Sequence, residues 1–207
     1  MRHPRQPRNH SSEIKAMQLL FNSPKLASDD WLQIAFVGSH GTGKTMLSHE
    51  VFKWMRRELD LPVIPIFEST RMFQLDQQEK DYERKLIQKR ASEFTHFGHF
   101  ISDRSLIDPL GYQKVVRGKI DASVKEFAFT HSKQLLFYIP ISFDIVDDGI
   151  RPIDKDYQQK VQDAIKGILD ESQLTYYTIS RVDMVERLNF VKHVVLHREG
   201  WYDKLYS

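Results

Sequence analysis

The chain has 207 residues, of which 41% are hydrophobic, so it suits a single globular domain with small additions. It has no cysteine, which excludes disulfides and thiolate metal sites. The formal net charge is only +2, so the chain as a whole does not look like a nucleic-acid-binding protein. Apolar stretches are too short for a membrane span, and residues 1–10 lack the apolar core of a secretory signal, so we expect an intracellular, cytoplasmic protein.

The basic residues are concentrated locally at the start of the sequence. Residues 1–10 carry three arginines, two histidines and no acid. One interpretation is a solvated tail without a binding role, with a short helix further on, within residues 1–30. The functional alternative is an arm that contacts the phosphates of a nucleic acid. On either interpretation, one main domain spans residues 31–207.

The first predicted strand covers residues 31–37, a short apolar run. A glycine-rich segment follows, and then Leu47, Val51, Trp54 and Met55 recur at helical spacing in a helix that reaches about residue 59. A strand, a glycine loop and a helix in this order point the N-terminus of the helix at an anion. This order predicts a phosphate-binding site at the loop.

Further strands are predicted over residues 61–67, 99–102, 134–141 and 175–179. Two prolines in 61–67 indicate an irregular or edge strand. Helices are predicted over 80–97, 108–116, 121–131, from Asp154 onward, and over 182–196, with Asp108 as an N-cap before a proline. Strands that alternate with helices predict an α/β fold, a five-stranded parallel sheet with helices on both faces.

The loop at residues 38–45 fits the P-loop pattern G-x-x-x-x-G-K-[ST]. Its glycines allow backbone N–H groups to wrap phosphate oxygens, the lysine ammonium reaches the β- and γ-phosphates, and the threonine hydroxyl can bind Mg²⁺. We therefore expect ATP and Mg²⁺ as cofactors. The predicted nucleotide-binding residues are Gly38, His40, Gly41, Thr42, Gly43, Lys44 and Thr45.

Charged side chains follow the other predicted strands. Glu68 and Arg71 follow the second strand, Asp103 and Arg104 follow the third, and an Asp-Asp-Gly-Ile-Arg segment that ends at Arg151 follows the fourth. Ligands of parallel sheets bind at the carboxyl ends of the strands. Any one of these residues alone is typical of a cap or a surface ion pair, but together they favour a catalytic site.

Phosphoryl transfer gives these residue types their tasks. The triphosphate must be held, its developing charge neutralised and the acceptor oxygen placed in line. The triphosphate can be held by Lys44, by the loop N–H groups and by Mg²⁺ bound to Thr45 and Asp103. An arginine from a loop can do the second, and a carboxylate near the acceptor hydroxyl can do the third.

These four motifs together resemble P-loop kinases of the nicotinamide riboside kinase-like, AAA ATPase-like group. This group is related to deoxynucleoside and thymidylate kinases and includes phage-encoded members. The resemblance spans roughly residues 34–195. It implies a kinase domain over residues 31–207, with a five-stranded core, a lid segment and an ATP-dependent phosphotransferase activity.

The resemblance also implies roles for single residues. Glu68 matches the acceptor-side carboxylate and is the expected general base. Arg71 and Arg104 match substrate-binding arginines, and Arg151 matches the lid arginine that closes over the phosphates. Gln88 falls where related nucleoside kinases have a glutamine that reads the acceptor base, although an exposed helical glutamine is the plainer interpretation.

Three functions stay open at this point. The first is a kinase that transfers the γ-phosphate of ATP to a hydroxyl of a nucleoside- or nucleotide-type acceptor. The second is a nucleic-acid kinase that acts on a modified nucleotide in DNA or RNA. The third is a regulatory NTPase that hydrolyses ATP without an acceptor. His193 and His197 are spaced four apart, but no motif accompanies them, so we interpret them as plain helix residues.

Overall fold

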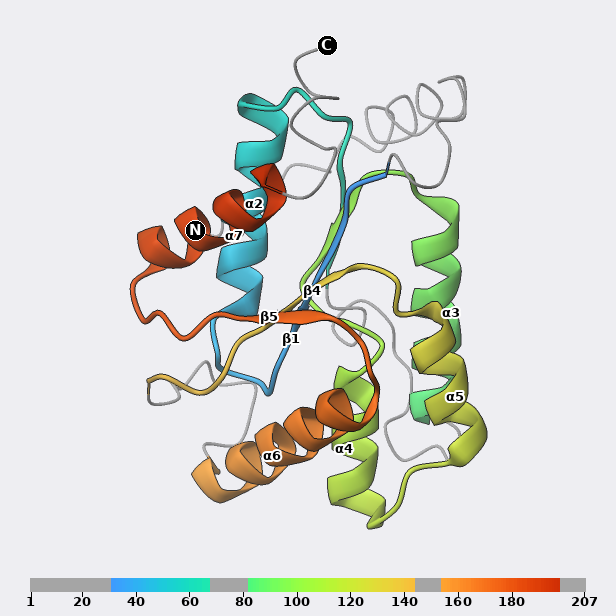
Figure 1. Ribbon diagram of the computed structural model, residues 1–207. Helices are drawn as coiled ribbons and strands as arrows, with labels where there is room; N and C mark the ends of the chain where they lie inside the picture. The colour runs from blue at the N-terminus through green and yellow to red at the C-terminus, as the bar shows by residue number, and fades with distance from the viewer. Residues whose placement is uncertain (1–30, 68–81, 144–153, 198–207) are drawn as a thin grey trace, which may run out of the picture. The chain divides into compact units, whose positions relative to one another are not determined.

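The structure is a computed structural model that describes residues 31–67, 82–143 and 154–197 (Figure 1). Contacts divide the chain into two compact units, Met1–Trp31 and Leu32–Ser207. All the described helices and strands belong to the second unit. Glu68, Arg71 and Arg151 lie outside the described residues, as do residues 1–30.

A five-stranded sheet forms the centre of this unit, and all its pairings are parallel. The strand order is β2-β3-β1-β4-β5, so the strand that leads into the P-loop is central. The strands are β1 (Gln33–Val37), β2 (Ile64–Ile66), β3 (Phe100–Ser102), β4 (Leu135–Tyr138) and β5 (Tyr176–Thr178). The predicted fold class is therefore confirmed.

Helices cover both faces of the sheet (Figure 1). On one face lie α2 (Lys44–Arg57) and α7 (Met184–Leu196), which follow the P-loop and β5. On the other face lie α3 (Tyr82–His96), α4 (Asp108–Arg117), α5 (Ala122–His131) and α6 (Lys155–Glu171).

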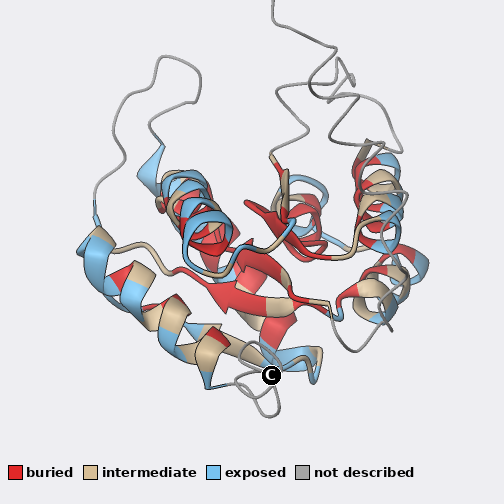
Figure 2. Cartoon of the chain, turned by 90° about the horizontal axis from the view of Figure 1, so that it is seen from above, coloured by how far each residue is buried: buried red, intermediate tan, exposed pale blue. Residues whose placement is uncertain are grey.

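The alternation of side chains along β1 explains the two cores. Ala35 and Val37 point into the core under α3 to α6, while Ile34 and Phe36 point into the core under α2 and α7. All four side chains are fully buried. A central parallel strand buried on both faces must be apolar at successive positions, as this strand is. Figure 2 shows the strands at the centre of the molecule mostly in the colour of buried residues.

The structure tests two predicted details, the position of β2 in the sheet and the N-cap of α4. β2 is an edge strand that pairs only with β3, in agreement with its prolines. The expectation that Asp108 caps α4 is wrong by one residue, because Ile107 is the N-cap and Asp108 is the first helical residue. The Asp108 carboxylate is instead bonded to the backbone of the P-loop and of the β3–α4 loop.

The close approach of α4 to α6 leads to a prediction about Gly111. A Cβ atom at Gly111 would lie 2.3 Å from Ile165 Cγ1, whereas a Cβ atom at Gly167 in α6 would meet nothing within 4 Å. We expect Gly111→Ala to lower the free energy of unfolding by about 1–3 kcal/mol through overpacking. The matched control Gly167→Ala should be neutral or raise it by up to about 1 kcal/mol. Urea unfolding measures both, and a stabilised Gly111→Ala variant would contradict the packing.

His99 leads to a prediction about pH. Its buried ring accepts a hydrogen bond at Nδ1 from the Leu32 N–H (2.9 Å), and burial lowers the pKa of His99 below its usual 6.5. The unfolded chain therefore binds a proton at this site more readily than the folded chain does. Stability should be full above about pH 6.5 and should fall as the pH drops below it.

The test compares urea unfolding at pH 7.5 and 5.5. In His99→Gln, whose amide oxygen can accept the same bond without titrating, the loss of stability on acidification should be smaller than in the unchanged chain. The control His193→Gln alters an exposed ring on α7 and should leave the pH dependence as it is. An identical pH dependence in all three proteins would rule out His99 as the source.

Candidate active site

The P-loop connects the central strand β1 to the first turn of α2. Gly43 precedes the helix with φ +86°, a left-handed conformation that glycine adopts without strain. A Cβ atom at Gly38 would lie 2.5 Å from the Ile139 carbonyl oxygen, so only glycine fits where the loop passes β4. The first N–H groups of α2 have no partner within the helix, and together with its dipole they form an anion site.

The lysine of the motif lies inside this loop. Lys44 is 5% exposed. Its ammonium donates to the Gly38 carbonyl (2.7 Å), the Ser39 carbonyl and Thr42 Oγ1 (3.2 Å). The positive charge is therefore held within the curve of the loop, where a bound phosphate would meet it.

Thr45 and Asp103 bring two chain segments together at the carboxyl edge of the sheet. β1 and β3 are parallel neighbours, and each residue follows its strand. Thr45 Oγ1 donates to Asp103 Oδ2 over 3.2 Å, and Asp103 is 2% exposed. A hydroxyl and a carboxylate are hard oxygen ligands, which Mg²⁺ prefers together with phosphate and water oxygens. These two residues therefore fit a magnesium ion.

Side chains from distant helices hold the first half of the P-loop. Asp108 on α4 accepts from the Gly38 N–H (3.1 Å), and Gln162 on α6 accepts from the Ser39 N–H (2.9 Å). The Tyr112 hydroxyl accepts from the His40 N–H (3.1 Å), while Gln158 Nε2 donates to the His40 carbonyl (2.7 Å).

These bonds engage the N–H groups of Gly38, Ser39 and His40 with protein acceptors. The N–H groups at Gly43 and in the first turn of α2 are then the ones that could bind a phosphate.

The buried carboxylate of Asp108 has several partners. Besides Gly38, it accepts from the N–H (2.9 Å) and the hydroxyl (2.7 Å) of Ser105, and an Arg104 Nη1 atom lies 3.9 Å from it. Asp108 is fully buried. It therefore ties the P-loop to the loop that carries Asp103.

Two buried arginines, Arg104 and Arg90, lie near the acids Asp103 and Asp108. Arg104 is 8% exposed, and its guanidinium lies over the Tyr112 ring, 5.7 Å from the centroid. Arg90 projects from the inward face of α3 and is 1% exposed. Burial lowers the pKa of Arg90, and the charges of Asp103 and Asp108 oppose this shift. Sequence analysis did not single out Arg90.

His40 projects between two helices. Its ring centroid lies 6.2 Å from that of Tyr112 on α4 and 6.0 Å from that of Tyr157 on α6. His40 Nδ1 also lies 3.2 Å from the Tyr112 hydroxyl. The aromatic neighbours fix the tip of the P-loop against α4 and α6. Burial raises the pKa of Tyr157, so its hydroxyl stays protonated at neutral pH.

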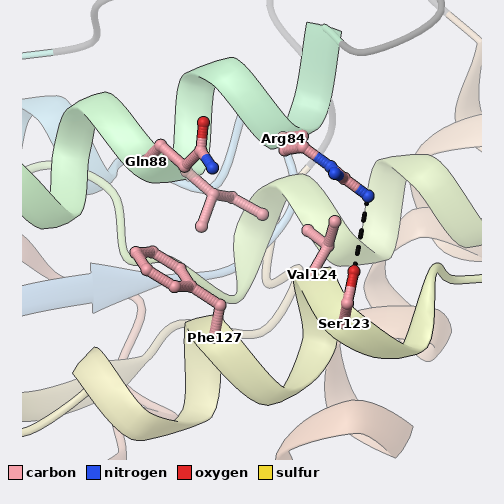
Figure 3. Close-up of a pocket in the computed structure, with 6 residues that line it drawn as sticks. Arg84, Gln88, Ser123, Val124 and Phe127 are labelled. Carbon is pink, nitrogen blue, oxygen red and sulfur yellow. Dashed lines mark hydrogen bonds between the residues drawn. The ribbon is translucent and has the colours of Figure 1, made fainter.

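Gln88 lies elsewhere on α3. It lines a small cavity of about 80 Å³ between α3 and α5, with Arg84, Ser123 and Phe127 around it (Figure 3). Arg84 Nη2 donates to Ser123 Oγ across this cavity (3.3 Å). Gln88 is exposed and two positions from the buried Arg90, so the two side chains project from different sides of the helix. Its role in reading a base stays a prediction.

Arg187 on α7 is a further residue that sequence analysis missed. It is fully buried and donates from Nη1 to the carbonyl of Thr42 in the P-loop (2.7 Å). Thr42 and Arg187 are 145 positions apart, and no motif surrounds Arg187. The only available sign was an arginine at an inward position of an otherwise apolar helix face.

Comparison with known proteins agrees with this geometry. The P-loop and the five-stranded parallel sheet define the fold of the P-loop nucleotide kinases. A family model described as an AAA domain matches residues 33–187, and the chain belongs to that family. None of the curated proteins is significantly similar to it in sequence.

Several solved structures share the fold. Thymidylate kinase from Ehrlichia chaffeensis is 16% identical with a TM-score of 0.58, and the match covers 79% of this chain and 98% of that one. Deoxyadenosine kinase from M. mycoides, with dCMP and dCDP bound, is 14% identical with a TM-score of 0.53 over 78% and 97%. The YorR protein from Bacillus subtilis, in complex with phosphorylated GDP, is 15% identical with a TM-score of 0.51 over 81% and 99%.

Two further observations concern the described residues alone. None of their helices has the length and apolar character needed to cross a membrane. They also contain no cluster of three or more histidine, aspartate or glutamate side chains that could hold a metal ion by itself. A magnesium ion at Thr45 and Asp103 would therefore rely on phosphate and water for its other ligands, as is usual for this ion.

Asp108 leads to a prediction about the loop. In Asp108→Asn, an amide N–H group would face a backbone N–H group in a buried place, so the free energy of unfolding should fall by about 2 kcal/mol or more. The control Asp156→Asn alters an exposed acid in the first turn of α6 and should cost only a few tenths to about 1 kcal/mol. Urea unfolding measures both, and equal losses would show that the Asp108 bonds contribute little.

Proposed function

We propose that this protein is an ATP-dependent kinase that transfers the γ-phosphate to a hydroxyl of a nucleoside- or nucleotide-type acceptor. The observation that carries the proposal is the pairing of Thr45 with Asp103 beside a complete P-loop. A lysine, a helix N-terminus and a pair of hard oxygen ligands then surround one place, where a magnesium-bound triphosphate fits. The names of the structural neighbours, thymidylate kinase and deoxyadenosine kinase, support the acceptor class.

The chain's own residues have distinct tasks in this proposal. Lys44 and the N–H groups of Gly43 and the first turn of α2 hold the β- and γ-phosphates. Thr45 and Asp103 would hold Mg²⁺, and the ion would supply positive charge that neutralises the phosphates. Arg104 follows the carboxyl end of β3, and we propose that it binds an acceptor or phosphate group.

The chemical step follows from these placements. The acceptor oxygen forms a bond to the γ-phosphorus while the bond from that phosphorus to the β–γ bridging oxygen breaks, and ADP leaves. The hydroxyl proton passes to a carboxylate, for which we propose Glu68. Arg151 is proposed to close over the phosphates, and Arg71 to bind the acceptor. Glu68, Arg71 and Arg151 are proposed from sequence alone.

The test measures ADP release with nucleosides, nucleotides and oligonucleotides as acceptors. We expect release to rise with at least one free nucleoside or nucleotide, and Glu68→Gln to lower this rate by roughly 100-fold or more while ATP binding persists. Asp103→Asn should lower the rate strongly too, because it removes the charged ligand proposed for the magnesium ion. The exposed substitution Arg57→Met serves as the control.

Three results would contradict the proposal. Turnover of about 1 s⁻¹ or faster without any acceptor would indicate a hydrolysing NTPase. Release stimulated only by oligonucleotides would indicate a nucleic-acid kinase. Undiminished transfer by Glu68→Gln would show that another group takes the proton.

A further inference from the structure

Arg187 connects three loops at the carboxyl edge of the sheet. Its Nη1 donates to the Thr42 carbonyl of the P-loop (2.7 Å) and its Nη2 to the hydroxyl of Ser142, which follows β4 (2.6 Å). Its Nε donates to the Arg181 carbonyl, which follows β5 (2.7 Å). The guanidinium also lies over the Phe143 ring, 5.4 Å from the centroid. One side chain thus fixes the P-loop relative to both loops beside it.

Within the described part of the chain, no acidic side chain pairs with this guanidinium. Its three hydrogen-bond acceptors are two carbonyls and a hydroxyl, all neutral. No carboxylate among residues 31–67, 82–143 and 154–197 forms an ion pair with it, although the side chain is fully buried. Burial lowers the pKa of Arg187, and no charge among the described residues opposes this shift. A buried cation without a counter-charge is unfavourable unless a ligand supplies the negative charge.

The peptide unit between Thr42 and Gly43 links this cation to the phosphate site. In a planar trans peptide, the C=O and N–H groups point in opposite directions. When Arg187 holds the Thr42 carbonyl, it also fixes the direction of the Gly43 N–H. A cation bonded to the carbonyl polarises the same unit and makes its N–H a stronger donor. A Cβ atom at Gly43 would lie 3.0 Å from Arg187 Nη1, so the guanidinium lies directly behind the loop.

We propose that Arg187 is a positioning residue for the nucleotide: it acts through the Thr42–Gly43 peptide to aim and polarise the Gly43 N–H, and it provides positive charge behind the P-loop for a nucleoside di- or triphosphate. Arg187 makes no contact with the nucleotide itself in this role. The inference rests on the proposed binding of a nucleotide at the P-loop. It predicts that the loss of Arg187 weakens nucleotide binding more with each phosphate beyond the first.

The experiment measures dissociation constants for Mg²⁺–ADP and for AMP by calorimetry at a temperature where each protein is folded. In Arg187→Met, we expect the constant for ADP to rise about tenfold or more, since a hydrogen bond from a charged group is lost. The constant for AMP should rise much less. Arg187→Lys keeps the charge and one donor. Its dissociation constant for ADP should lie between those of the unchanged chain and of Arg187→Met. Arg57→Met, which alters an exposed arginine on α2, should bind as the unchanged chain does.

A purely structural role would give a different pattern. Equal weakening of ADP and AMP in a folded Arg187→Met protein would overturn the inference, as would unchanged affinity for ADP. If Arg187→Met does not fold, Ser142→Ala replaces it, because that variant removes one acceptor of the guanidinium and leaves the P-loop sequence intact. It should weaken ADP binding about two- to fivefold, and unchanged binding would overturn the inference. Failure of the unchanged chain to bind Mg²⁺–ADP would instead overturn the proposed function.

Discussion

The parallel pairing of β1 with β3 is the constraint on which the site depends. Ala35 is in register with Ser102, so the segments that follow the two strands leave the sheet side by side. Asp103 is the first residue after β3, and the P-loop begins directly after β1. The distance of 3.2 Å between Thr45 Oγ1 and Asp103 Oδ2 follows from this register. An antiparallel or shifted pairing would separate the hydroxyl from the carboxylate.

The P-loop is held by side chains from distant helices as well as by hydrogen bonds within the loop. Asp108, Tyr112 and Gln162 accept from three successive loop N–H groups, and all three come from helices on the α4–α6 face. This arrangement divides the loop into an anchored first half and a second half that we propose faces the phosphates of a nucleotide. The N–H groups of a loop fixed in this way are preorganised hydrogen-bond donors. Such donors stabilise the charge of a ligand without having to reorient when it binds.

Sequence analysis predicted the parts of the site whose signals are local. The P-loop is a contiguous motif, and the strand before Asp103 is a short apolar run, so both could be identified from a single segment. Arg90, Gln162 and Arg187 carry no local signal, because their importance comes from contacts over long sequence separations such as 123 and 145 positions. Asp108 was noticed, but as a helix cap. Only the tertiary fold shows that its carboxylate bonds to Gly38.

Arg90 and Arg187 show how the same residue type can serve two electrostatic purposes. Arg90 comes from α3 on one face of the sheet, where the negative charges of Asp103 and Asp108 act on it. Arg187 comes from α7 on the other face, where its acceptors are neutral. The Arg90 guanidinium can stabilise the ionised carboxylate of Asp103, which is one of the two oxygen ligands proposed for magnesium. The Arg187 guanidinium leaves a surplus of positive charge behind the P-loop. A polyanion at the loop would balance that surplus, so the loop is electrostatically complementary to a nucleotide.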